Sequence, residues 1–373
     1  MRVLIAPDGF GGTLSPTQAA DAIAAGWSAA APRDALDLAP MSDGGPGFVE
    51  VLAAARPNGR QVMVTVEDPL ARPVVASFLL DGATAYLESA QACGLALLAG
   101  GERDPTITTT YGVGQLLTAA LDEGAGRIVV GLGGSATNDG GAGMLAALGL
   151  ARADSGGRRL PPGGSALARI GRLSGELDLR LRRASLVAAT DVDAPLLGLR
   201  GASAVFGPQK GATREDVVVL DHALSRWADV LEAHLTVAVR DDPGAGAAGG
   251  LGAALFAIGA TRQPGVALVA DVVGLARRVA AADLVVTGEG RLDATSLTGK
   301  VVSGVAAAAA TLAVPCLVLA GQVTVGRREA AAAGIEAAYA ITDTVDVATA
   351  LSRPRDQLAA LAARVARQWS RDV

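Results

Sequence analysis

Short apolar runs that end in polar or glycine-rich turns recur along the chain. Segments of helical pattern separate these runs, so the pattern predicts βαβ units and a mainly parallel sheet. In such sheets ligands bind beyond the carboxyl ends of the strands, and we therefore expect the polar turns to converge on one cleft. The runs that fit buried strands are Val3–Ala6, Ile128–Val130, Leu186–Ala189, Leu284–Val286 and Cys316–Ala320.

Helical patterns fill much of the remaining chain. The first begins with Ser15 and Pro16, which suit the N-cap and first helical position. The predicted helices are Ser15–Ala29, Gly114–Glu123, Met144–Ala151, Asp216–Arg240, Gly252–Ala257, Val302–Leu312 and Arg355–Ser370. The glycine-rich stretch 240–250 is predicted to be a flexible or ligand-covering loop.

The length of 373 residues exceeds the usual size of one compact core, so two domains are expected. The segment Val64–Leu80 partly alternates and contains Pro69 and Pro73, which favours antiparallel strands. We place one domain crossing near residues 68–73 and the return near 280–283. The expected domains are 1–70 with 282–373, and an inserted domain over 71–281 that carries the longest glycine run.

Composition excludes several classes of partner. The net charge is −5 and aromatic residues make up 3%, so neither a nucleic acid nor an anionic membrane surface is an expected partner. Cys93 and Cys316 lie in apolar settings and are predicted to be buried free thiols, as in a reducing cytoplasm. The uncharged stretch Val301–Val323 is predicted to be a buried helix, a turn and a buried strand rather than a membrane span.

The densest candidate site is the run Gly131–Gly143, GLGGSATNDGGAG, between an apolar strand and a helical pattern. Glycines let backbone N–H groups approach a ligand, and a helix start offers free N–H donors, so the run predicts a phosphate site. The alternative is an ordinary βα turn with helix caps. The run also satisfies G-x-G-x-x-A, a weak dinucleotide signal, whereas Walker A and protein-kinase signatures are absent from the sequence.

Charged residues gather in the other polar turns. Asp191 and Asp193 follow one predicted strand, and Glu289, Arg291 and Asp293 follow another. Phosphoryl transfer needs a base, carboxylates for a divalent cation and fixed positive charge, which these turns could supply. The chain's two lysines, Lys210 and Lys300, both lie in glycine-containing turns. Taken singly, each acid could be a turn or helix cap, and each lysine a solvated surface charge.

Together these motifs resemble the class I glycerate kinases, nearly from end to end. The resemblance implies an α/β protein with a flavodoxin-like domain built from both chain ends and a second, inserted α/β domain, the active site lying in the cleft between them. It also implies ATP-dependent, magnesium-assisted phosphorylation of D-glycerate, most readily at the 2-hydroxyl. The matching segments are APDGFGGTLSPTQAADAIAAGW, PMSDGGPG, TTTYGVGQL, GLGGSATNDGGAGML, TDVDAPLLG, AVFGPQKGA, TGEGRLDATSLTGK and LAGQV.

The resemblance carries over residue roles. The nucleotide would be held by Gly133, Gly134, Ser135, Thr137 and Asn138, with Lys210 and Lys300. The reaction centre would comprise Asp191, Asp193, Arg291 and Asp293, with Asp191 and Asp193 holding magnesium. The acid substrate would contact Asp8, Ser42, Asp43 and Glu289. A cytoplasmic homodimer is expected.

The chain departs from the family pattern at two turns. Gly9 and Gly11 stand where the family usually has serine and lysine, and Pro46 and Phe48 replace a glutamate and a threonine. Two further hypotheses stay open. The dinucleotide signal of the Gly131 loop leaves an NAD-dependent oxidoreductase as one alternative, and the departures at Gly11 and Pro46 leave a nucleotide-binding regulator without turnover as the other.

Overall fold

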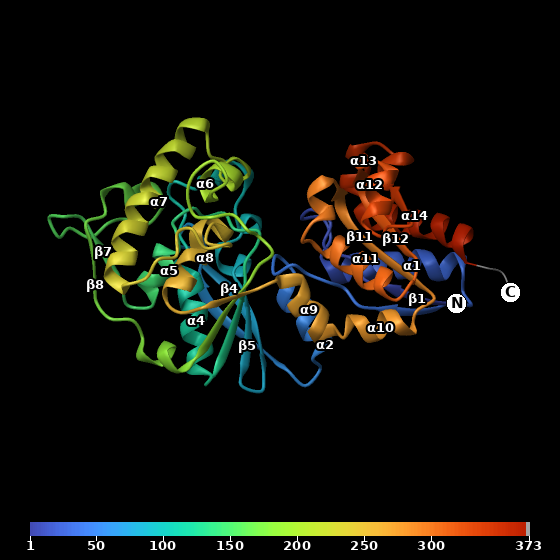
Figure 1. The fold of residues 1–373 in the computed structure, drawn as a ribbon, viewed down its shortest axis with the longest axis horizontal. Coiled ribbons are helices and arrows are strands. Elements are labelled where there is room, and N and C mark those ends of the chain that lie inside the picture. The colour runs from blue at the N-terminus through green and yellow to red at the C-terminus, as the bar shows by residue number, and fades with distance from the viewer. Residues whose placement is uncertain (371–373) are drawn as a thin grey trace. The chain divides into compact units, whose positions relative to one another are not determined.

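The computed structural model describes residues 1–370, which form two compact units (Figure 1). The terminal unit comprises Met1–Asp43, Glu50–Ala55 and the chain from Gly265 onwards. The central unit comprises Gly44–Val49 and Arg56–Pro264. Each unit has its own sheet and its own hydrophobic core.

The terminal unit contains a five-stranded parallel sheet in the order β13-β12-β11-β1-β2. Counted along the chain within this unit, the order is that of flavodoxin-like sheets, and it reverses between β1 and β11. The strands are β1 (Arg2–Ile5), β2 (Ala35–Leu38), β11 (Leu284–Leu292), β12 (Cys316–Val323) and β13 (Ala337–Ala340).

Helices of the terminal unit cover this sheet. The helix α1 starts as predicted, because Ser15 accepts a hydrogen bond from the Gln18 backbone N–H and Pro16 takes the first helical position. It packs closely on α14 at Gly26, where any side chain would overlap the Ala359 carbonyl. The helices are α1 (Pro16–Ala30), α9 (Gly265–Val273), α10 (Leu275–Ala281), α11 (Val301–Thr311), α12 (Arg327–Ala332), α13 (Val347–Ser352) and α14 (Pro354–Trp369), while α2 (Phe48–Ala55) begins in the stretch assigned to the central unit.

The central unit contains a six-stranded sheet in the order β10-β9-β6-β5-β4-β3. Strands β5, β6, β9 and β10 run parallel, and β3, β4 and β5 run antiparallel, which confirms the antiparallel excursion predicted from Val64–Leu80. The strands are β3 (Arg60–Glu67), β4 (Pro73–Asp81), β5 (Thr84–Glu88), β6 (Arg127–Gly131), β9 (Ser185–Ala189) and β10 (Thr261–Gln263), with β7 (Ala151–Ala153) and β8 (Arg172–Ser174) in a separate pair.

The α-helices of the central unit contribute to its hydrophobic core, in which Trp227 on α7 is fully buried. Two of them are shorter than the pattern predicted. The helix α5 ends at Ala147 instead of Ala151, and α7 ends at Leu235 instead of Arg240, where Thr236 takes a left-handed conformation. They are α3 (Ala90–Cys93), α4 (Tyr111–Asp122), α5 (Ala142–Ala147), α6 (Ala202–Phe206), α7 (Arg214–Leu235) and α8 (Ala247–Ala257).

The units divide the chain at other residues than those expected from sequence. Strand β3 pairs with β4 along its whole length, so the first crossing precedes β3 instead of following it. At the other end, α9 and α10 belong to the terminal unit, so the return lies at residues 264–265. The polar turns are also divided: those after β1, β11 and β12 belong to one sheet, and those after β6 and β9 belong to the other. They therefore do not share one sheet edge.

Two other predictions are confirmed. The stretch Val301–Val323 forms α11, a turn and the buried strand β12, and no helix among residues 1–370 is both long and apolar enough to cross a membrane. Cys93 and Cys316 are buried free thiols, and burial raises the pKa of each to about 12. The thiols are therefore uncharged and packed as small apolar groups.

Candidate active site

The carboxyl edge of the terminal sheet brings two acids together where the strand order reverses. Asp8 follows β1 and Glu289 lies near the end of β11, and the Asp8 backbone N–H donates to the Gly288 carbonyl over 2.8 Å. This reversal point is where flavodoxin-like sheets bind ligands. The strand order therefore places Asp8 and Glu289 at the same edge of this sheet.

The acids at this edge are held in an unfavourable setting for charge. Glu289 is 8% exposed, and its buried Oε1 atom has no hydrogen-bond partner among the described residues. Burial raises the pKa of Glu289 to about 6, although Ser296 and Lys300 oppose the shift. Burial, followed by the neighbouring Asp43, also raises the pKa of Asp8 well above its usual value. A carboxyl group in this state can accept and release a proton near neutral pH.

The cations at the same edge come from two places: Arg291 lies in the last residues of β11, which is longer than the predicted strand Leu284–Val286, and Lys300 lies in the turn that follows. Arg291 is exposed and Lys300 is half-buried, and the Lys300 charge acts on both Asp8 and Glu289. Asp293 has a local structural task, because its Oδ1 accepts hydrogen bonds from the Thr295 N–H at 2.9 Å and the Thr295 hydroxyl at 2.6 Å. These bonds lower the pKa of Asp293 and fix the turn that leads to Lys300.

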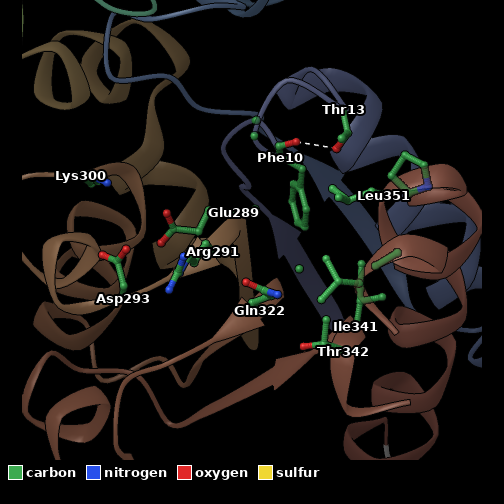
Figure 2. Close-up of a pocket in the computed structure, with 17 residues that line it drawn as sticks. Phe10, Thr13, Glu289, Arg291, Asp293, Lys300, Gln322, Ile341, Thr342 and Leu351 are labelled. Atoms are coloured by element: carbon green, nitrogen blue, oxygen red, sulfur yellow. Dashed lines mark hydrogen bonds between the residues drawn. The ribbon is translucent and has the colours of Figure 1, made fainter. Parts of the chain in front are cut away.

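A cavity of about 430 Å³ lies beside this cluster and within the terminal unit (Figure 2). Figure 2 shows Glu289, Arg291, Asp293 and Lys300 at one end and Phe10, Ile341 and Leu351 at the other, with Gln322 and Thr342 along one side. Sequence reasoning assigned no role to the residues of the apolar end. Their signal was weak, because apolar residues after a strand are usually core.

The other residues predicted to contact the acid substrate, Ser42 and Asp43, follow strand β2 of the same sheet. Ser42 is buried at 1% exposure, and Asp43 is half-buried with its charge acting on Asp8 and Glu289. Gly11 is exposed in the cavity lining with a φ of +52°, and a Cβ placed there would meet nothing within 4 Å. The absence of a lysine at this position therefore leaves open space.

The glycine-rich run of the central unit folds around one buried carboxylate. Asp139 accepts hydrogen bonds from the backbone N–H groups of Thr110, Gly141 and Gly143 at 2.9, 3.1 and 3.0 Å. The helix start that sequence analysis took as a source of free donors is thus capped internally by Asp139. The Asp139 carboxyl group therefore takes up backbone donors at the start of α5 that were expected from sequence to be free for a ligand.

Three of the predicted phosphate ligands are also enclosed. Ser135, Thr137 and Asn138 are at most 3% exposed, and Asn138 donates to the Ser203 hydroxyl at 2.9 Å. Lys210, itself 2% exposed, donates to the Ser135 hydroxyl at 2.9 Å and the Thr137 carbonyl at 2.7 Å. Burial lowers the pKa of Lys210 to about 8. Through these two hydrogen bonds Lys210 fixes the conformation of the glycine-rich run at Ser135 and Thr137.

The accessible part of the loop is its first bend. Gly133 is half-buried and Gly134 is exposed, and with Ser135 and Lys210 they line a small cavity of about 120 Å³. A Cβ at Gly134 would lie 2.6 Å from the Pro46 ring, and its φ is +63°. The backbone at this bend is therefore available to a ligand, in keeping with part of the predicted nucleotide loop.

The stretch 240–250 differs from its prediction as a covering loop. Gly244, Gly246, Gly249 and Gly250 are buried, and a Cβ at Gly249 would overlap the Thr137 carbonyl at 1.9 Å. The lack of side chains at these glycines allows the backbone to pack closely against the glycine-rich run, so the stretch is a packed segment and not an exposed covering loop.

The paired acids after β9 belong to the central unit, whereas Asp8 and Glu289 belong to the terminal unit. The side chain of Asp193 is 81% exposed and forms an ion pair with Arg262 at 2.6 Å. Asp191 is half-buried. Among residues 1–370, no group of three or more acidic, histidine or cysteine side chains is arranged to hold a metal ion. Any cation here would need further ligands from the substrate.

The dinucleotide interpretation of the same loop has little structural support. A dinucleotide fold has an acidic residue about 20 residues after the glycines, and Asp154 is the residue nearest to that spacing. It follows the short strand β7 and pairs with Arg158. Strand β7 pairs with β8 in a separate antiparallel ribbon, whereas a dinucleotide fold needs its acidic residue after the next strand of the parallel sheet.

Comparisons with known proteins agree with this arrangement. The family model described as "Glycerate kinase family" matches residues 3–370. The chain is 45% identical over 345 residues to the glycerate kinase of Bacillus subtilis (strain 168), covering 91% of this chain and 90% of the relative. It is 41% identical to the glycerate 2-kinase of Escherichia coli (strain K12), covering 92% and 91%.

The fold agrees as well. A crystal structure assigned to glycerate kinase 2 of Salmonella typhimurium LT2 matches with a TM-score of 0.77 and 40% identity, covering 99% of this chain and 98% of that chain. Sequence similarity of this extent covers both units and the turns at their strand ends. The chain belongs to the glycerate kinase family of phosphotransferases.

Proposed function

We propose that this enzyme transfers the γ-phosphoryl group of ATP to D-glycerate, at the 2-hydroxyl, and releases 2-phosphoglycerate and ADP. The names of the relatives support the acceptor, and the Escherichia coli relative's name supports the 2-position. The single observation that carries the proposal is the pairing of a buried, partly unpartnered Glu289 with the cations Arg291 and Lys300 in one cavity.

The proposal gives a chemical task to the charged residues of this cavity and to the polar residues after β1 and β2. Arg291 and Lys300 bind the glycerate carboxylate and the transferred phosphoryl group, since charged donors form the stronger hydrogen bonds. Asp8, Ser42 and Asp43 surround the hydroxyl groups of the acid. Asp293 keeps the Lys300 turn in place through its bonds to Thr295.

The proton and phosphoryl steps balance as follows. The Glu289 carboxylate accepts the proton of the 2-hydroxyl. The substrate oxygen forms a bond to the γ-phosphorus, and the bond between that phosphorus and the ADP oxygen breaks. Because the pKa of Glu289 is about 6, the group is largely ionised at neutral pH and remains basic enough to take the proton.

The nucleotide phosphates bind in this proposal at the Gly133–Gly134 bend, with backbone N–H groups as donors. Lys210 contributes by holding Ser135 and Thr137 in place. The oxygen ligands of Asp191 and Asp193 suit magnesium, which commonly uses one or two protein carboxylates and takes its other ligands from phosphates and water. When bound, magnesium would neutralise the charge of the phosphates.

A coupled ADP-release assay with D-glycerate and ATP tests the proposal, and ³¹P NMR of the product distinguishes the 2-phosphate from the 3-phosphate. An NAD-reduction assay runs beside it. Turnover with NAD and none with ATP would favour the oxidoreductase, and ATP binding without turnover would favour the regulator. The cytoplasmic homodimer stays a prediction, for which sedimentation of the purified chain tests the oligomeric part.

A further inference from the structure

The cavity of the terminal unit separates its charged and apolar residues to opposite ends. The charged end carries Glu289, Arg291, Asp293 and Lys300, whereas the other end carries Phe10, Ile341 and Leu351 (Figure 2). Val347 and Ala350 also line the cavity, from the same helix α13 as Leu351. Phe10 and Ile341 belong to the hydrophobic core of this unit, and their surfaces close the apolar end. A ligand that fills such a cavity has one polar end, which can pair with charged side chains of both signs, and one apolar end.

Two side chains at this end remain exposed although they are large and apolar. Val347 is 48% exposed and Leu351 is 60% exposed. They lie four positions apart on α13 and therefore on the same face of the helix, and both line the cavity. Exposed apolar residues that gather at a cavity mark a binding surface more often than isolated ones do.

The size of the cavity also fits a small-molecule ligand that reaches both of its ends. Its volume of about 430 Å³ falls within the range of roughly 300–1,000 Å³ that is typical of small-molecule sites. D-Glycerate is a three-carbon acid with a polar group on every carbon. It satisfies the charged end and leaves the apolar end facing water. Gly11 adds to the free space, because it has no side chain and nothing lies within 4 Å of its Cβ direction.

We propose that the apolar end of this cavity binds the hydrocarbon substituent of 2-hydroxy acids larger than glycerate, so that the enzyme phosphorylates such acids at the 2-hydroxyl. The inference rests on the proposed function, since the carboxylate and the hydroxyl take the places given there to glycerate. The reaction is unchanged: the hydroxyl proton passes to Glu289, the oxygen–phosphorus bond forms, and the bond to ADP breaks. The substituent R takes the place of the hydroxymethyl group.

ADP release is measured with ATP and a series of D-2-hydroxy acids: glycerate, lactate, 2-hydroxybutanoate, 2-hydroxypentanoate and 2-hydroxyhexanoate. From lactate onwards, kcat/KM is expected to rise about fourfold for each added methylene until the cavity is filled, the factor for burying one CH₂. ³¹P NMR checks that each product is a 2-phosphate ester. A flat or falling series beyond lactate would overturn the inference.

The variant Leu351→Asp places a charge at the apolar end, and Leu312→Asp places the same charge at an exposed leucine of this unit outside the cavity. The ratio of kcat/KM for 2-hydroxypentanoate to that for glycerate should fall at least tenfold in Leu351→Asp and stay unchanged in Leu312→Asp. An equal fall in both variants, or none in Leu351→Asp, contradicts the inference. So does a rise in the KM for ATP in Leu351→Asp with glycerate as acceptor, which would assign the apolar end to the nucleotide base.

The outcomes separate this inference from the function on which it rests. Turnover of glycerate without turnover of larger acids removes the inference alone. Turnover of larger acids without turnover of glycerate removes glycerate as the substrate and retains the inference. The absence of ATP turnover with every acid removes both.

Discussion

The polar residues at the strand ends have different hydrogen-bonding states in the two units. In the central unit, polar groups of the glycine-rich run are hydrogen-bonded within the protein: Asp139 accepts from the start of α5, and Lys210 donates to the Ser135 hydroxyl and the Thr137 carbonyl. In the terminal unit, Asp8 and Glu289 share one edge, and the pKa of each is raised. The strand ends of the central unit therefore present mainly backbone groups to a ligand, whereas those of the terminal unit present carboxyl groups with raised pKa values.

The comparison shows that the density of polar residues in a motif does not measure its chemical availability. The run Gly131–Gly143 is the more conspicuous of the two in sequence, yet much of its polar content is enclosed. Glu289 is less conspicuous in sequence, near the end of β11, but its buried Oε1 atom is without a hydrogen-bond partner in the described structure. A buried polar group of this kind is costly, and such groups tend to be retained where they act on a ligand.

The largest expected effect is that of Glu289→Gln. Loss of the proton acceptor should lower kcat by roughly 10²–10⁴-fold. In the native enzyme kcat should rise with pH around a midpoint near 6, because Glu289 must lose its proton to act, and the variant should lack this limb. Steady-state kinetics from pH 5 to 8 measure both effects, with Glu336→Gln, an exposed glutamate of the same unit, as the control. A native-like profile in Glu289→Gln would remove it as the base.

The paired acids after β9 should differ from one another. Asp191→Asn is expected to lower kcat about 10²-fold, the scale of losing a carboxylate that holds magnesium at the phosphates. Asp193→Asn should cost less than about tenfold, because Asp193 is largely exposed and already paired with Arg262. Kinetics at several magnesium concentrations test the pair, and the defect of Asp191→Asn should ease at high magnesium. Equal defects would show that both acids act at the reaction centre.

The accessible bend of the glycine loop should be sensitive to any side chain. Gly134→Val is expected to weaken ATP binding by roughly tenfold or more, since the new Cβ clashes with the Pro46 ring and the φ of +63° is unfavourable for valine. Calorimetric titration with ATP measures the change. Gly124→Val is the matched control, because Gly124 also has a positive φ but open space around it. Normal ATP affinity in a folded Gly134→Val variant would exclude this bend as the phosphate site.

The two lysines provide a direct comparison between the units. Lys300→Met should raise the KM for the acid substrate by about 10–100-fold, the equivalent of a charged hydrogen bond, with a smaller effect on ATP. Lys210→Met should mainly raise the KM for ATP, because the loop loses its bonds to Ser135 and Thr137. Separate titrations of both substrates give the two KM values. If the lysines affected the same substrate, the division of tasks between the edges would fail.

The smallest expected effect is on stability. The pKa of Glu289 is raised in the folded state, so its protonated form stabilises the fold at low pH, and this contribution is lost as pH rises from about 4.5 through about 6. The loss amounts to ~2 kcal/mol. Glu289→Gln should therefore be more stable than the native chain at pH 7.5 by about this amount, with little difference at pH 4. Urea unfolding at both pH values measures the free energy of unfolding of the two proteins. A variant less stable than the native chain at pH 7.5 would contradict the conclusion that burial destabilises the ionised Glu289 carboxylate.

The sequence predicted local structure well where chemistry and periodicity agreed. Ser15 and Pro16 marked the start of α1, and Pro315 separated a buried helix from a buried strand in an uncharged stretch that resembled a membrane span. These features depend on hydrogen bonds and burial between near neighbours, which the sequence contains directly. The predicted boundaries of the units were less accurate. Strand β3 belongs to the central unit because it pairs with β4, and local composition does not reveal which strand it pairs with.

By itself the sequence determined that this is an α/β protein with strand-end turns rich in glycine and charge, and its motifs determined the family. Which of those turns would be open to a ligand was decided by tertiary structure. Asp139 turned inward because backbone N–H groups from α5 and Thr110 converge on it, and Lys210 was buried because the loop above needs its donors. Glu289 came to face Asp8 because β1 and β11 are neighbours despite their distance along the chain. Burial shifts the pKa values of Asp8, Glu289 and Lys210, and neither burial nor long-range strand pairing can be derived from the local pattern of residues.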